Sequence, residues 1–166
     1  MFNRLALIGC GLMGGSLALA MQRACLVRHV VAYSPSEGTL QAALQAGVIH
    51  EAAHSPADAT AHADLVVVAV PVAATETVLR SIASSLSAQT IVMDVGSTKQ
   101  NVIEAAEATL GSHIGQFVPA HPIAGKEVAG IAHADPDLYR GKQVILTPGR
   151  ATRIGALQQV TVLWEA

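Results

Sequence analysis

Short apolar runs alternate with longer, alanine-rich segments along the chain. The apolar runs are rich in valine, leucine and isoleucine, and the longer segments place their apolar residues at helical spacing. This alternation predicts strands at 5–9, 29–33, 48–49, 64–70, 90–95, 115–120 and 143–146. It predicts helices at 14–23, 37–45, 75–86 and 99–110, and a segment of helical composition at 150–166.

Strands that alternate with helices favour βαβ units and a parallel sheet. The run at 64–70 is apolar on both faces, as expected for a central parallel strand. We therefore expect an α/β fold with a doubly wound, mostly parallel sheet and helices on both faces.

The composition fits this fold and narrows the function. Of 166 residues, 51% are hydrophobic, 13% are charged and only 3% are aromatic, so the core must consist of small aliphatic side chains. The net charge is −2 and no basic run occurs, which argues against nucleic-acid and membrane partners. The two cysteines cannot form a disulfide framework. The apolar stretch before Cys10 is too short for a signal peptide, so we expect a cytoplasmic protein.

A glycine motif, Gly9-x-Gly11-x-x-Gly14, follows the first predicted strand and opens the first predicted helix. In this context Gly9 permits a tight turn, Gly11 lets a pyrophosphate approach the backbone, and Gly14 lets helix and strand pack closely. The sequence therefore predicts a Rossmann dinucleotide-binding domain. The cofactor contacts that we expect come from Gly9, Gly11, Leu12, Met13, Gly14, Ser34, Ser36, Val70 and Pro71.

The choice between NAD and NADP depends on the end of the second strand. Enzymes selective for NAD place an acid there, about 20 residues after the glycine motif, to bind the ribose 2′-hydroxyl. This chain has Ser34 and Ser36 instead, which removes a charge that would repel a 2′-phosphate. The same residues also fit a capping box with Pro35 at the first helical position. We expect NADP, slightly favoured, or NAD.

Two polar clusters follow later strands, where ligands bind in open α/β sheets. One is Asp94-Val95-Gly96-Ser97-Thr98-Lys99, and the other is His121-Pro122-Ile123-Ala124-Gly125-Lys126-Glu127. The strand aims His121 at the crevice, and Pro122 restricts its backbone to an extended conformation. Ser97 could instead cap the following helix, and Lys99 could be a solvated residue of its first turn.

With the glycine motif, these two clusters resemble the prephenate/arogenate (cyclohexadienyl) dehydrogenase family of tyrosine biosynthesis. The three motifs occur in the family's order, and the string His-Pro-Ile-Ala-Gly at 121–125 is the most specific of them. The resemblance implies an oxidoreductase that oxidatively decarboxylates prephenate, arogenate or both, with hydride transfer to NAD(P).

The resemblance also implies roles for single residues. His121 would accept the proton of the ring hydroxyl, for which an ordinary histidine pKa of about 6.5 is suitable. Ser97 would orient His121 and the substrate, and Glu127 would join a charged network at the entrance. Lys126 stands where many family members have a smaller hydroxyl residue, and it could either attract a substrate carboxylate or face solvent.

For the domain organisation, we expect a dinucleotide-binding domain at 1–150 and, at 151–166, the start of a helical C-terminal domain that is otherwise absent. In the family, that domain dimerises and supplies substrate-binding residues, so a full-length form is expected to be a homodimer. Two other hypotheses remain open. The chain could be another Rossmann reductase, such as a 3-hydroxyacid dehydrogenase or a pyrroline-carboxylate reductase, or a nucleotide-binding module without catalysis.

Overall fold

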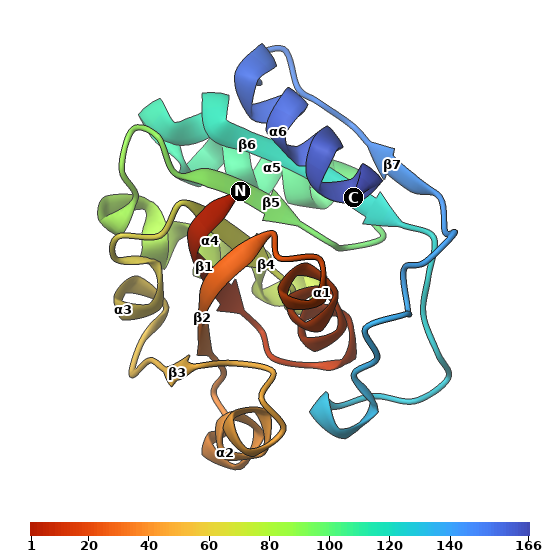
Figure 1. Ribbon diagram of the computed structural model, residues 1–166. Coiled ribbons are helices and arrows are strands. Elements are labelled where there is room, and N and C mark those ends of the chain that lie inside the picture. The colour runs from red at the N-terminus through yellow and green to blue at the C-terminus, as the bar shows by residue number, and fades with distance from the viewer.

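A single seven-stranded sheet organises the computed structural model, which describes all residues 1–166 (Figure 1). The strand order is β3-β2-β1-β4-β5-β6-β7. The first six strands are parallel, and β7 pairs antiparallel with β6. The strands are β1 (Phe2–Ile8), β2 (Val27–Tyr33), β3 (Glu51–Ala52), β4 (Leu65–Val68), β5 (Ile91–Asp94), β6 (Phe117–Pro122) and β7 (Val144–Leu146).

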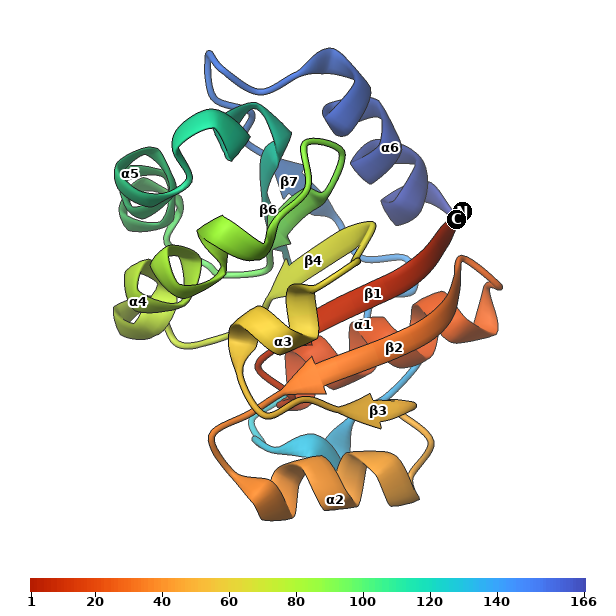
Figure 2. The same ribbon diagram turned by 90° about the vertical axis from the view of Figure 1, so that its left-hand side faces the viewer.

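Helices cover both faces of the sheet (Figures 1 and 2). They are α1 (Leu12–Arg23), α2 (Glu37–Gln45), α3 (Pro56–Thr60), α4 (Val72–Ile82), α5 (Lys99–Thr109) and α6 (Ile154–Glu165), with short 3-10 turns η1 (Ala83–Ser85), η2 (Gly111–Gln116) and η3 (Ile131–His133). None of the helices combines the length and the apolarity that crossing a bilayer demands.

Alternate side chains of the strands point into two separate cores. Leu5, Leu7 and Val67 pack with α1, α2 and α6 in one core. Ala6 and Ile8 pack with α3, α4 and α5 in the other. This two-sided burial explains why the strands are almost entirely apolar, and it confirms the predicted doubly wound α/β fold.

The C-terminal helix belongs to the same packed unit as the sheet. Its buried residues Ala156, Val160 and Leu163 join the core that contains α1. The helical composition predicted at 150–166 is therefore confirmed over Ile154–Glu165. The boundary after residue 150 and a helical domain beginning at 151 stay predictions.

Three local features differ from what the sequence predicts. Val48 and Ile49 are buried but lie in the turn after α2, and the third strand is β3, where Glu51 pairs with Val31. Helix α3 was not predicted. Helix α4 begins directly after Pro71 rather than at residue 75.

Candidate dinucleotide site

The glycine turn between β1 and α1 is held against the sheet by contacts that only glycine allows. Gly9 has φ +99°, and a Cβ carbon there would lie 2.4 Å from the carbonyl oxygen of Ala69. A Cβ carbon on Gly14 would lie 2.4 Å from the carbonyl oxygen of Gly9 and 2.8 Å from Cδ1 of Leu7. The tight turn and the close helix–strand packing predicted for these two glycines are thus present.

Gly11 differs from its two neighbours in the motif. It is the N-cap of α1, its backbone is extended, and a Cβ carbon there would meet no atom within 4 Å. The first turn of α1 also carries no acidic side chain. The open space above Gly11 therefore faces free helix amides and the positive end of a helix dipole, a combination that favours a bound anion such as a pyrophosphate.

Two cavities adjoin at this turn, beyond the carboxyl ends of the parallel strands. The first, of about 540 Å³, extends over Tyr33 and Ser34 toward α4. The second, of about 470 Å³, extends over Leu12 and Met13 toward Ser97. The residues lining both cavities are Gly11, Ala69, Val70, Pro71 and Gly130. Together the cavities form a crevice at the topological switch point, where β1 lies between β2 and β4 and the strand order reverses. Open α/β sheets bind their ligands at this place.

Most of the predicted cofactor residues line this crevice. Gly9, Gly11, Ser34, Val70 and Pro71 line the first cavity, and Gly11, Leu12, Met13, Val70 and Pro71 line the second. Gly14 lies beneath the turn and acts through packing.

Ser36 lies outside the crevice and caps α2. Its hydroxyl accepts a hydrogen bond of 3.2 Å from the backbone N–H of Thr39. The helix begins at Glu37, so Pro35 precedes the cap. The predicted capping box, with Pro35 at the first helical position, is therefore wrong, because the N-cap is Ser36 rather than Ser34.

The two residues predicted to be catalytic lie on neighbouring strand ends. Ser97 is exposed in the loop after β5 and lines the second cavity. His121 is half-buried on β6, opposite Ile145 of β7, and lines neither cavity. Ser97 makes no cap for α5, whose N-cap is Thr98 without a side-chain hydrogen bond.

The segment after β6 carries the other two predicted substrate residues. Lys126 lines the second cavity, and its ammonium forms an ion pair of 2.7 Å with the Asp135 carboxylate. This ion pair, followed by a hydrogen bond from the Asp137 backbone N–H, lowers the pKa of Asp135. Glu127 is exposed and lines neither cavity.

The β6–β7 connection docks on α1 through the small residues that follow the glycine motif. A Cβ carbon on Gly15 would lie 2.5 Å from Cδ1 of Ile131. The buried Ser16 hydroxyl accepts a 2.9 Å hydrogen bond from the Asp135 backbone N–H. The Tyr139 hydroxyl donates to the carbonyl oxygen of Met13 at 2.8 Å. The connection thereby forms one wall of the second cavity.

Sequence reasoning missed one buried ion pair beside the site. Lys99 is not a solvated residue, because its ammonium bonds the Asp94 carboxylate and, at 2.8 Å, the carbonyl oxygen of Ala120. Burial raises the pKa of Asp94, and the Lys99 charge opposes this shift. Burial likewise lowers the pKa of Lys99, against the attraction of Asp94. The sequence offers one signal for this ion pair: an acid, Asp94, ends a strand, and Lys99 begins the helix after the loop.

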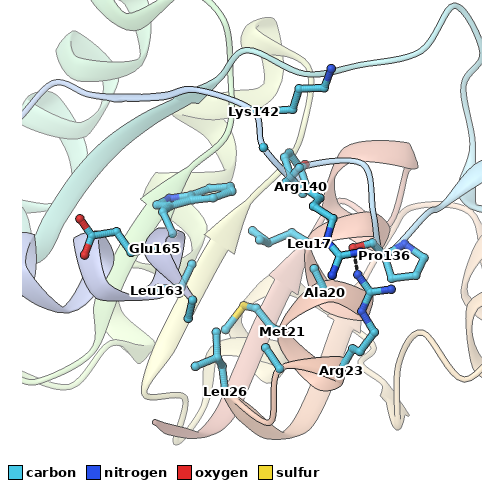
Figure 3. A pocket seen from close by; sticks show the side chains of 15 residues that line it. Leu17, Ala20, Met21, Arg23, Leu26, Pro136, Arg140, Lys142, Leu163 and Glu165 are labelled. Atoms are coloured by element: carbon cyan, nitrogen blue, oxygen red, sulfur yellow. Dashed lines mark hydrogen bonds between the residues drawn. The ribbon is translucent and has the colours of Figure 1, made fainter.

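A third cavity lies at the opposite end of α1 (Figure 3). It has a volume of about 540 Å³, and Leu17, Met21 and Leu163 contribute apolar side chains to it. Arg23 stands at its border and binds the Asp137 carboxylate at 2.7 Å. None of the predicted site residues lines this cavity, so it is separate from the crevice at the glycine turn.

The strand order, the glycine turn and the crevice at the switch point define a Rossmann-type dinucleotide-binding domain. Comparison with known proteins narrows this class. A family described as "Prephenate dehydrogenase, nucleotide-binding domain" matches residues 17–166, and the chain belongs to this family. This agrees with the first of the three hypotheses drawn from the sequence.

Individual relatives agree with the family. The chain is 37% identical to prephenate dehydrogenase of Bacillus subtilis, over 96% of this chain and 43% of that protein. It is 35% identical to cyclohexadienyl dehydrogenase of Zymomonas mobilis, over 99% of this chain and 55% of that protein. A crystal structure of prephenate dehydrogenase from Aquifex aeolicus with hydroxyphenyl propionate and NAD+ superposes with a TM-score of 0.92 and 31% identity, covering 99% of this chain and 57% of that one. The chain thus spans about half the length of these relatives.

Proposed function

We propose that this domain binds NAD(P) and contributes the cofactor-binding half of an oxidative decarboxylation of prephenate, arogenate or both, in tyrosine biosynthesis. The observation that carries the proposal is the open face of Gly11 at the junction of the two cavities. The names of the relatives support the substrate class, and the Aquifex aeolicus structure contains NAD+.

The crevice has the features that a dinucleotide requires. The backbone N–H groups at the start of α1 would hold the pyrophosphate above Gly11. The cavity over Tyr33 and Ser34 would hold the adenosine, and the cavity beside Ser97 would hold the nicotinamide. When bound, the oxidised nicotinamide supplies the hydride acceptor.

The end of β2 supports a preference for NADP over NAD. Ser34 lines the adenosine side of the crevice and carries no charge that would repel a 2′-phosphate. Ser36 is committed to capping α2, although its hydroxyl hydrogen remains free to be donated. We therefore assign the contact with the 2′ position first to Ser34.

The residues near the ends of β5 and β6 would bind the substrate and take its proton. A nitrogen of the His121 imidazole would take the proton of the ring hydroxyl while the ring carbon loses its hydride and the carboxylate leaves as carbon dioxide. Ser97 would orient the hydroxyl group. Lys126 and Glu127 would act at the entrance, where Lys126 must exchange Asp135 for a substrate carboxylate to bind it directly.

An assay of the complete gene product tests the activity. With prephenate or arogenate present, it should reduce NADP+ or NAD+ and release one carbon dioxide for each cofactor reduced. The 166-residue chain alone should bind cofactor but turn over negligibly, since we expect a further domain to supply part of the substrate site. A complete product that binds cofactor but oxidises neither substrate would contradict the proposal, and so would substantial activity of the 166 residues alone.

A further inference from the structure

We propose that the Asp94–Lys99 ion pair is a positioning device that sets the backbone on which His121 stands and, through the same carboxylate, the loop that carries Ser97. The inference rests on the proposed function, because those two residues are the ones assigned to catalysis. Neither Asp94 nor Lys99 lines the crevice, so the pair acts through its neighbours and not by touching a ligand.

Strand β6 extends beyond the end of its pairing with β5. The ladder between β5 and β6 ends where Asp94 pairs with Pro119. Strand β6 continues through Ala120 and His121 to Pro122, with only β7 beside it. The Asp94–Pro119 pairing bonds the Ala120 N–H to the Asp94 carbonyl oxygen. The Ala120 carbonyl oxygen has no backbone donor on that side, because the Gly96 N–H that would continue the ladder is bound to the Asp94 side chain.

Two side chains add hydrogen bonds at this end of the ladder. Asp94 Oδ1 accepts a hydrogen bond of 3.2 Å from the Ala120 N–H. Lys99 Nζ donates to the Ala120 carbonyl oxygen at 2.8 Å. The ion pair thus supplies a donor for the Ala120 carbonyl oxygen and a second acceptor for the Ala120 N–H, directly before His121.

The same carboxylate also holds the Ser97 loop. Asp94 Oδ2 accepts a 2.9 Å hydrogen bond from the Gly96 N–H. Ser97 lies between Gly96, which this bond fixes, and helix α5, whose first residue Lys99 bonds the same oxygen. One buried group therefore couples the two strand ends from which Ser97 and His121 project.

Burial makes this arrangement rigid and costly. The Asp94 side chain is 3% exposed and the Lys99 side chain 13%. A buried ion pair is often no more stable than apolar residues of the same size, so stability alone gives little reason for placing one here. At this location the ion pair has another use, because it can fix the geometry of the site.

A double variant separates positioning from stability. Lys99→Met alone leaves a buried carboxylate without its partner and should lower the unfolding temperature of the chain. Asp94→Leu combined with Lys99→Met removes both charges and both acceptor oxygens, and should recover most of that loss. Lys142→Met, an exposed lysine outside the crevice, is the matched control and should behave as wild type.

The first measurement is amide hydrogen exchange in the 166-residue chain, which needs neither substrate nor activity. In the double variant, the amides of Ala120 and Gly96 should exchange about tenfold faster, while the amide of Val118 within the β5–β6 pairing stays protected. Unchanged exchange at Ala120 and Gly96 would overturn the claim that the pair fixes this backbone, whatever the enzyme does.

The second measurement is turnover by the complete gene product. The double variant should lose roughly 100-fold in kcat with an unchanged KM for the cofactor, because a misplaced base slows chemistry without altering the glycine turn. Full kcat in a double variant whose Ala120 amide exchanges faster would show that the pair is merely structural. If the wild type binds cofactor but oxidises neither substrate, the proposed function fails, and the exchange experiment still decides whether the pair sets the backbone.

Discussion

Gly14 lies against Gly9 so closely that a Cβ carbon on Gly14 would stand 2.4 Å from the Gly9 carbonyl oxygen. This contact joins the first turn of α1 to the end of β1. The N-terminus of α1 therefore lies against the carboxyl end of β1. Gly11 is the glycine of the motif with no atom near its Cβ position. The three glycines of the motif thus have different functions, two in packing and one in leaving space.

Gly14→Ala should destabilise the domain by about 1–3 kcal/mol, the usual cost of overpacking a close contact. Thermal or denaturant unfolding of the purified chain measures the effect. Gly155→Ala is the control, since Gly155 is exposed in α6 and has no atom near its Cβ position. That substitution should be neutral or stabilise by up to about 1 kcal/mol. Equal stabilities of the two variants would contradict the packing role of Gly14.

Ser34→Asp should shift cofactor preference from NADP toward NAD. A carboxylate at this position would repel a 2′-phosphate and could accept a hydrogen bond from a 2′-hydroxyl. Calorimetric titration of wild type and variant with both cofactors measures the change. Glu37→Gln, on the exposed start of α2, controls for a general change of charge in this region. The assignment fails if wild type binds NAD much more tightly than NADP.

His121→Ala should lower the turnover of the complete gene product by roughly two to four orders of magnitude, the usual contribution of a positioned general base. Cofactor affinity should hardly change, because His121 lines neither part of the crevice. Steady-state kinetics and a parallel cofactor titration give both quantities. A variant that loses cofactor affinity but keeps its kcat would contradict the assignment of His121 as the general base.

Cys10 should react with thiol reagents far more slowly than Cys25. Cys10 is buried, and burial raises the pKa of its thiol from 9.0 to about 11, whereas Cys25 is exposed. Above pH 9 the unfolded chain would lose the Cys10 proton while the folded chain keeps it, so this thiol should reduce stability as the pH rises from 9 toward 11. Alkylation mapped by mass spectrometry checks the order, and Cys10→Ala should flatten this part of the stability profile.

The elements that sequence reasoning predicted correctly are those whose pattern directly reflects burial. Strand β4 reads as a continuous apolar run because both its faces are covered, and α1 is marked by the glycine turn before it. Val48 and Ile49 show the limit of this reasoning. They are apolar because they contact the core from a turn, and an apolar pair in a buried turn has the same pattern as a short strand.

The other missed features depend on contacts between distant parts of the chain. Helix α3 has only five residues, too few for a periodic pattern. Ser55, whose hydroxyl accepts a hydrogen bond from the Asp58 N–H, is of a residue type that often caps helices, and it is the signal that the sequence offers. The role of Lys99 required knowing that its ammonium reaches Ala120, 21 residues away. The ion pair of Lys126 with Asp135 likewise follows from the path of the β6–β7 connection and not from local spacing.

Titration of NADP+ and NAD+ into wild type and Gly11→Val tests whether a dinucleotide binds at the glycine turn. A valine side chain at Gly11 meets no protein atom within 4 Å of its Cβ carbon, so the variant should fold and unfold like wild type. It should nevertheless lose cofactor binding, because the side chain would occupy the space proposed for the pyrophosphate. Gly155→Val, placed on the exposed side of α6, should bind cofactor as wild type does. A folded Gly11→Val chain with unchanged affinity for both cofactors would show that the pyrophosphate does not bind above Gly11.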